Sequence, residues 1–310
     1  MTSLHKAVED YLAMRRALGF ELRLPGGMLR DFASFLKSES ASHVTTDRAL
    51  RWATQPVGVQ PAQWANRLSV IRQFARFMSA SDPRTEIPPL GLLPYRYKRK
   101  LPYIYRDDEV RALLRAARRI PSETGLRAAS YSTLIGLLAV TGLRINEALG
   151  LDDQDVDLAE GVLTIRRTKF GKSRLVPLHP TTMRALKRYV RVRDRLRPPR
   201  PPDAFFVGEQ GRRLTEWAVR YTFNRLSRQT GLRGATDRRG PRLHDFRHRL
   251  AVKTLIGWYR RGVDVERRLP VLSTYLGHGH VTDTYWYLTA VPELLRLAAE
   301  RLEAHGGLKP

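Results

Sequence analysis

The spacing of apolar residues predicts a helical amino-terminal region over residues 1–94. Apolar side chains recur at helical spacing near the amino terminus and again around residue 30. A third helix is expected after the cap Thr45-Thr46-Asp47, and a fourth from about Pro61 to Met78. The fourth helix has one apolar face, and its other positions include Arg67, Arg72 and Arg76. We therefore predict a small four-helix, SAM-like domain with basic helix surfaces.

A proline-rich stretch follows over residues 83–102 and breaks the helical pattern. Residues 95–102 are predicted to be a linker between two domains. Its basic run suits contact with a phosphate backbone, although a solvated spacer explains the run equally well when it is taken alone. The basic residues concerned are Arg96, Lys98, Arg99 and Lys100.

Residues 103–310 read as a second, α+β domain with a small antiparallel sheet. The apolar segment from Ala128 to Thr141 predicts a buried helix that Gly142 ends, and helix resumes at Ile145. Strand-like segments at 161–165 and 174–178 flank a turn, which predicts a hairpin. Further helices are expected over 107–119, 180–196, 214–230, 244–260, 265–276 and 292–304. The fold class expected for the whole chain is therefore mainly α.

The charge of the chain indicates a polyanionic partner. The 310 residues include 55 Lys and Arg against 30 Asp and Glu, a formal net charge of +25. Double-stranded DNA is the first candidate, and an anionic membrane surface is the second, because the basic residues do not gather on one amphipathic helix. The chain has no cysteine, which excludes disulfides and thiolate chemistry. Without a signal-peptide core or a long apolar run, it is expected to be cytoplasmic and DNA-associated.

Two segments carry candidate phosphate ligands. Arg144 stands at the start of a helix behind Gly142, where free backbone N–H groups and a guanidinium favour an anion, and Glu147 could hold that arginine in place. A surface ion pair is the alternative. His244 and Arg247 lie three residues apart, on one face of a helix, and could bind a phosphate and move a proton. We interpret the neighbouring His248 as structural.

The other candidates lie in turns or among aromatic residues. Lys169 or Lys172, in the hairpin turn, could protonate a leaving oxygen, although turn lysines are usually only solvated. His278 follows Gly277, a natural helix C-cap. His280 is a second candidate, but a metal site is disfavoured because no carboxylate or cysteine stands at ligand spacing. Tyr287 follows His278 by nine residues and Tyr285 is its rival, whereas a tyrosine in such an aromatic cluster is normally core packing.

Taken together and in this order, the motifs resemble the tyrosine recombinase (phage integrase) family. The resemblance covers roughly residues 103–304, and the amino-terminal helices are similar in kind to the family's core-site-binding domain. Spacing within the family pattern selects Tyr287 over Tyr285 and Lys169 over Lys172. The matching motifs are Thr-Gly-Leu-Arg144-Ile-Asn-Glu147, Lys169-Phe-Gly-Lys-Ser-Arg, His244-Asp-Phe-Arg247-His, Leu-Gly-His278 and Tyr287.

The resemblance implies a reaction and assigns roles. Arg144 and Arg247 would clamp the scissile phosphate, and Tyr287 would attack it to give a 3′-phosphotyrosyl bond and a free 5′-hydroxyl. Lys169 would be the general acid for that hydroxyl. His244 would assist proton transfer at the tyrosine, and His278 would hydrogen-bond the phosphate. No cofactor and no metal is implied.

The resemblance also implies an assembly and a biological setting. Family members act as a synaptic tetramer on two duplexes, and residues 292–304 could dock onto a neighbour, while the free protein could be a monomer. Accessory recombinases or directionality factors are possible partners. The long segment before Leu-Gly-His resembles recombinases of transposons and other mobile elements. Two alternatives stay open: a type IB topoisomerase, and a DNA-binding protein that has the fold without the chemistry.

Overall fold

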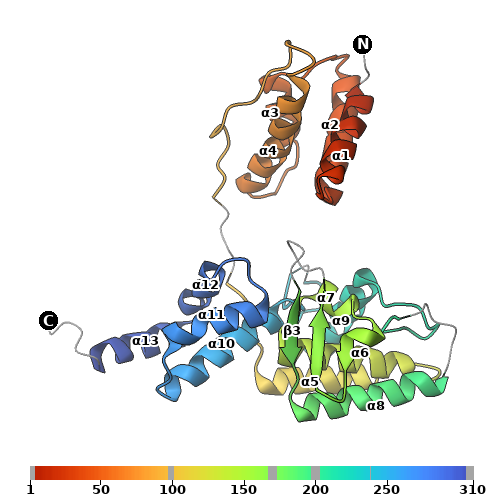
Figure 1. Ribbon diagram of the computed structural model, residues 1–310, viewed down its shortest axis with the longest axis vertical. Coiled ribbons are helices and arrows are strands. Elements are labelled where there is room, and N and C mark those ends of the chain that lie inside the picture. Colours follow the sequence, from red (N-terminus) through yellow and green to blue (C-terminus); the bar gives the residue numbers. More distant parts are fainter. Residues whose placement is uncertain (1–3, 97–100, 167–172, 197–202, 238, 305–310) are drawn as a thin grey trace. The chain divides into compact units, whose positions relative to one another are not determined.

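The computed structural model describes residues 4–96, 101–166, 173–196, 203–237 and 239–304 (Figure 1). The chain divides into two compact units, Met1–Lys100 and Leu101–Pro310, each with its own hydrophobic core. Among the described helices, none is long and apolar enough to cross a membrane.

The first unit contains the four predicted helices. Trp52 is fully buried at its centre, with its ring edge-on to Phe32 and its indole N–H donating to Asp31 at 3.0 Å. Thr45 caps the third helix as expected, because its hydroxyl accepts from the backbone N–H of Arg48 at 3.4 Å. The helices are α1 (Leu4–Ala17), α2 (Arg23–Ser38), α3 (Thr46–Thr54) and α4 (Pro61–Met78).

Two arginines of α4 do not lie on an exposed basic surface, contrary to the prediction. Arg72 is only 8% exposed, and it donates to the carbonyl oxygens of Pro88 at 2.6 Å and Pro89 at 2.7 Å. Arg67 lies over the Trp52 ring at 3.6 Å and donates to the Trp52 carbonyl oxygen. Both side chains therefore hold the first unit together, and Arg72 fastens the segment around Pro88 to α4. Arg76 is exposed.

The second unit is mainly helical and contains a small antiparallel sheet in the order β1-β2-β3. Residue Leu163 of β2 pairs with Val156 of β1 and Val176 of β3, and Ile165 pairs with Arg174. The two-residue strand β1 was not predicted, because so short a strand leaves no periodic pattern. The elements up to the sheet are α5 (Asp107–Arg118), α6 (Leu126–Thr141), α7 (Ile145–Leu149), η1 (Asp153–Asp155), β1 (Val156–Asp157), β2 (Val162–Ile165) and β3 (Arg174–Pro177).

Helix α6 forms the centre of this unit, as its apolar sequence predicted. Figure 1 shows α6 beside α5 and α8. Its buried side chains, such as Leu134 and Leu138, belong to a core that also contains residues of α5, α8 and the sheet. The helix begins at Leu126, two residues earlier than predicted, and ends at Gly142, which has a left-handed φ of 63°. The chain then turns directly into α7, so that Arg144 stands at the junction of the two helices.

The carboxyl-terminal helices share a separate core cluster. It contains Leu255, Leu272, Tyr287 and Leu294, and α10, α11, α12 and α13 contribute to it. Helix α12 was not predicted, because threonine and aromatic residues favour helix only weakly and packing decides its conformation. The remaining elements are α8 (Pro180–Leu196), α9 (Glu216–Gln229), α10 (Asp245–Arg260), α11 (Val265–Leu276), α12 (Thr282–Ala290) and α13 (Pro292–Ala304).

Candidate active site

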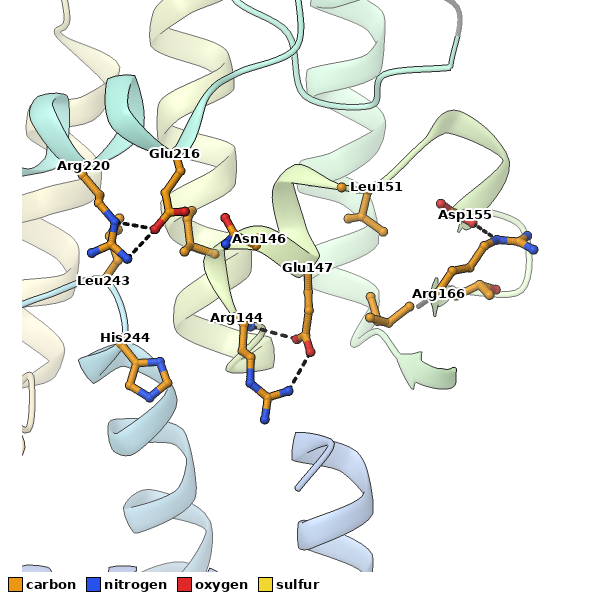
Figure 2. Close-up of a pocket in the computed structure, with 14 residues that line it drawn as sticks. Arg144, Asn146, Glu147, Leu151, Asp155, Arg166, Glu216, Arg220, Leu243 and His244 are labelled. Atoms are coloured by element: carbon orange, nitrogen blue, oxygen red, sulfur yellow. Dashed lines mark hydrogen bonds and ion pairs between the residues drawn. The ribbon is translucent and has the colours of Figure 1, made fainter. Parts of the chain in front are cut away.

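Arg144 is held at the amino-terminal end of α7 by Glu147. The Glu147 carboxylate accepts from the Arg144 backbone N–H at 2.9 Å and from its Nη1 at 2.8 Å (Figure 2). The Nη2 atom donates to the carbonyl oxygen of Gly277 at 3.0 Å. The predicted role of Glu147 as the anchor of this arginine is therefore confirmed. The Arg144 side chain keeps 32% exposure, which leaves its guanidinium accessible.

Arg247 lies behind Arg144 and carries a buried positive charge. It is 2% exposed and donates to two backbone carbonyls, that of Gly142 at 3.0 Å and that of Leu276. Among the described residues, no carboxylate forms an ion pair with it. Burial, followed by the like charge of Arg144, lowers the pKa of Arg247 to about 10. A buried cation without a neutralising carboxylate favours the binding of an anion beside it.

His244 precedes α10 and shares a pocket with Arg144. The cavity has a volume of about 420 Å³. Figure 2 shows the His244 imidazole and the Arg144 guanidinium among the side chains that line it. The residue as a whole is exposed, yet partial burial of the imidazole, followed by the Arg247 charge, lowers the pKa of His244 to about 4. At neutral pH the imidazole is therefore uncharged. Other polar residues that line the cavity are Asn146, Glu147, Asp155, Thr164, Arg166, Glu216 and Arg220.

His278 follows the C-cap of α11, as predicted from Gly277. Gly277 has a left-handed φ of 68°, and the His278 backbone N–H donates to the Ser273 carbonyl oxygen at 3.0 Å. The imidazole Nδ1 lies 2.7 Å from the hydroxyl oxygen of Thr284, at the start of α12. Burial, followed by the Arg247 charge, lowers the pKa of His278 to about 4.

Tyr287 lies beside this histidine, on the next helix. Its ring is stacked on His278 with centroids 6.1 Å apart and an angle of 18° between the ring planes. Tyr287 is 2% exposed, and its phenol is near enough to Arg247 to influence the pKa of that guanidinium. Tyr285 is 44% exposed and has no comparable contact with a histidine among the described residues. Tyr287 therefore lies beside His278 and near Arg247, whereas Tyr285 is exposed.

His248, which the sequence interpretation treats as structural, packs beside the candidate site residues. Residues four apart share a helix face, and the rings of His244 and His248 are 4.8 Å apart. The His248 ring also packs against Tyr287, with centroids 5.5 Å apart. Its Nδ1 atom is buried without a hydrogen-bond partner in the described structure. Burial, followed by the neighbouring His244, lowers the pKa of His248 to about 3.

Arg174 is a residue of this site that the sequence reasoning missed. Its side chain is 8% exposed, and its Nη1 and Nη2 donate to the two oxygens of Glu147 at 3.0 and 2.8 Å. Its Nε donates to the Tyr275 carbonyl oxygen at 2.9 Å. In the sequence, its position in the hairpin motif was the one feature that could have indicated a role at the site. Thr284 was missed as well, because a threonine near aromatic residues carries no signal of its own.

Five candidate residues lie outside the described residues. They are Lys169 and Lys172 in 167–172, and Lys98, Arg99 and Lys100 in 97–100. Arg96 is described and exposed, and so is His280. Within the described ranges, no group of three His, Asp or Glu side chains is arranged to hold a metal ion.

The chain was compared with known proteins. Residues 104–293 match the model of the phage integrase family. The chain is 50% identical over 307 residues to y4rB of Sinorhizobium fredii, whose name describes an integrase/recombinase, with 98% of each chain covered. It is 32% identical over 242 residues to the tyrosine recombinase XerD of Caulobacter vibrioides, which covers 77% of this chain and 74% of that protein.

Solved structures share the fold. The integrase of transposon Tn1549 in complex with transposon right-end DNA matches with a TM-score of 0.69 at 16% identity, covering 98% of this chain and 99% of that one. The recombinase XerH bound to its difH substrate matches with a TM-score of 0.66 at 22% identity, covering 96% and 84%. The family model that matches residues 104–293 and the identity to y4rB and XerD show that the chain belongs to the phage integrase family of tyrosine recombinases, enzymes that break and rejoin DNA.

Proposed function

We propose that this protein is a site-specific recombinase that cleaves duplex DNA through Tyr287 and moves or resolves a mobile element. The observation that carries the proposal is the position of Tyr287 beside Arg247, a buried cation without an ion-paired carboxylate among the described residues. A scissile phosphate would supply the missing negative charge. Arg144, 32% exposed and anchored by Glu147, is the second clamp for its non-bridging oxygens.

The proposed cleavage proceeds by in-line attack on phosphorus. The Tyr287 oxygen forms a bond to phosphorus, the bond from phosphorus to the 5′-oxygen breaks, and the products are a 3′-phosphotyrosyl link and a 5′-hydroxyl. His244 is uncharged at neutral pH and accepts the phenol proton, while Lys169 supplies a proton to the leaving oxygen. Attack by a 5′-hydroxyl of the second duplex reverses these bonds and joins the strands.

Burial of Tyr287 implies that α12 shifts before attack. At 2% exposure the phenol is enclosed by the rings of His248 and His278. Helix α13 follows at once and packs on α10 with Leu294 buried, whereas Leu295 and Leu302 are exposed. We therefore propose that exposed leucines of α13 contact a neighbouring subunit in a synaptic tetramer. Accessory recombinases or directionality factors belong to the same proposal.

A covalent selection tests the nucleophile. The protein is incubated with nicked duplexes that carry a randomised core, so that the short 5′-hydroxyl fragment diffuses away after cleavage and traps the adduct. DNA that stays attached under denaturing conditions is sequenced. Tyr287→Phe is expected to abolish the adduct and leave DNA binding unchanged, while Tyr285→Phe keeps both. An adduct that survives in Tyr287→Phe and disappears in Tyr285→Phe would transfer the role to Tyr285.

Two rival functions are separated by further measurements. A type IB topoisomerase relaxes supercoiled plasmids of any sequence without recombinants, whereas the proposed enzyme joins two plasmids only when each carries the selected site. A DNA-binding protein without chemistry gives no adduct from any duplex of the library. Matching the selected core to the ends of elements in the source genome tests the role in a mobile element.

A further inference from the structure

Three arginine side chains converge on the last carbonyl groups of α11. Arg174 donates to the carbonyl of Tyr275, Arg247 to that of Leu276, and Arg144 to that of Gly277. The final carbonyls of a helix have no backbone donor and stand at the negative end of its dipole, so guanidinium groups stabilise them. The turn that leads into His278 is therefore fixed by three cations from three different elements.

Arg174 differs from the other two because each of its three guanidinium nitrogen atoms donates a hydrogen bond inside the protein. Both of its Nη atoms bind Glu147 at 3.0 and 2.8 Å, and its Nε binds Tyr275. With all three nitrogen atoms engaged in this way, it does not present a free edge to a phosphate. Arg174 is therefore not a phosphate ligand in this arrangement, and its effect on the reaction has to pass through the residues it holds.

Glu147 is shared between two arginines. Its oxygens accept from Arg144 and from Arg174, and its side chain is 8% exposed. Burial alone would raise the pKa of Glu147, but the hydrogen bonds from Arg174 and Arg144 outweigh it and lower the pKa overall. Arg174 thus keeps this carboxylate ionised and fixed, and the carboxylate in turn sets the direction of the Arg144 guanidinium.

The space around Gly277 shows how closely the Arg174 side chain approaches the turn before His278. A Cβ atom added at Gly277 would lie 2.6 Å from Nη1 of Arg174 and 2.8 Å from its Cζ. The left-handed φ of 68° at this position also favours glycine. The close approach and the backbone conformation together require glycine immediately before His278.

We infer that Arg174 is a positioning residue that aligns two parts of the catalytic site. It orients Arg144 through Glu147, and it fixes the His278 turn through Tyr275. The inference rests on the proposed function. Lysine cannot replace this residue, because one ammonium group cannot hold both carboxylate oxygens and the Tyr275 carbonyl.

The test compares single-turnover adduct formation in Arg174→Gln and Arg174→Lys with wild type on the selected duplex. A displacement on the order of 1 Å in catalytic groups lowers a rate by about 100-fold, so we expect a loss of that size in both variants, with an unchanged Kd for the duplex. Arg184→Gln, an exposed arginine on α8, is the matched control and is expected to keep the wild-type rate.

A double-variant cycle shows whether the effect passes through Glu147. If it does, Arg174→Gln combined with Glu147→Gln is no slower than the slower single variant, whereas independent effects multiply. If Arg174→Gln alone does not fold, Arg174→Lys takes its place in the cycle, because lysine keeps a positive charge beside the buried Glu147 carboxylate. Multiplied effects, or a rate for Arg174→Gln within about threefold of wild type, would overturn the inference.

A readout that needs no activity separates this inference from the proposed function. Hydrogen exchange of the amides of Gly277 and His278 is expected to accelerate in Arg174→Gln and to stay unchanged in Arg184→Gln. If the wild-type protein forms no adduct with any duplex, the proposed function is refuted. If hydrogen exchange at Gly277 and His278 is unchanged in Arg174→Gln, only the positioning role is refuted.

Discussion

The imidazole Nδ1 of His278 and the hydroxyl oxygen of Thr284 are 2.7 Å apart, which ties the turn after α11 to the first turn of α12. Thr284 is fully buried, and it stands one helical turn before Tyr287. With Nδ1 engaged in this hydrogen bond, Nε2 is the nitrogen that remains for a phosphate. One hydrogen bond thus sets the orientation of His278 and the position of the helix that carries the tyrosine.

Thr284→Val is expected to slow adduct formation by about fivefold, because a lost hydrogen bond is worth about 1 kcal/mol. Valine keeps the shape of threonine and removes only the hydroxyl. Thr284→Ser keeps the hydroxyl and is expected to stay near the wild-type rate. Single-turnover cleavage of the selected nicked duplex measures both. Equal rates for Val and Ser would show that the hydrogen bond does not matter for cleavage.

The buried histidines predict a loss of stability in acid. The pKa of His248 is lowered from 6.5 to about 3, mainly by burial, and that of His278 to about 4. Below about pH 6.5 these histidines are protonated in the unfolded chain but remain neutral in the folded chain. The free energy of unfolding therefore falls as the pH falls from about 7 toward 4. Above about pH 7 these histidines contribute no further change.

Urea unfolding at pH 7, 6 and 5 measures this slope. Most carboxylates remain ionised over that range, so the histidines dominate the change. His248→Gln removes one titrating group and is expected to reduce the slope. His5→Gln, on the surface of the first unit, is the control and should leave it unchanged. A wild-type free energy of unfolding that is constant over this range would contradict the prediction.

Arg72→Gln is expected to destabilise the first unit by about 1–3 kcal/mol, because hydrogen bonds from a buried charged group are lost. The carbonyl oxygens of Pro88 and Pro89 lose their donors in this variant. Arg76→Gln, on the exposed side of the same helix, should leave stability within about 0.5 kcal/mol of wild type. Hydrogen exchange of α4 amides in the full chain compares the two. Similar protection in both variants would show that Arg72 has no structural role.

Binding to DNA is expected to weaken steeply as salt rises, because a chain with a net charge of +25 releases counterions from the phosphates. If Arg76 contacts a phosphate, Arg76→Gln lowers the slope of log K against log salt by about 0.9. Arg72→Gln should leave that slope unchanged, since its guanidinium is engaged by carbonyl groups. Fluorescence anisotropy with a labelled duplex measures the slopes. A flat salt dependence for the wild type would contradict phosphate-dominated binding.

The sequence alone predicted the described α-helices other than α12, the hairpin strands, the cap at Thr45 and the turn at Gly277, because these features depend on residues that are close along the chain. It also predicted that Glu147 anchors Arg144, since three residues on a helix bring the two together. The order and spacing of the motifs were enough to suggest the family, which the comparisons established.

Only the tertiary structure decided which side chains are used for packing and which are left for chemistry. Arg72 and Arg76 look alike in sequence, yet one is buried against Pro88 and the other is exposed. Arg174 meets Glu147 across 27 residues and Tyr275 across 101, and no local pattern encodes such a contact. The physical reason is that periodicity shows which face of an element is apolar, whereas the partner of a polar group is set by how separate elements pack.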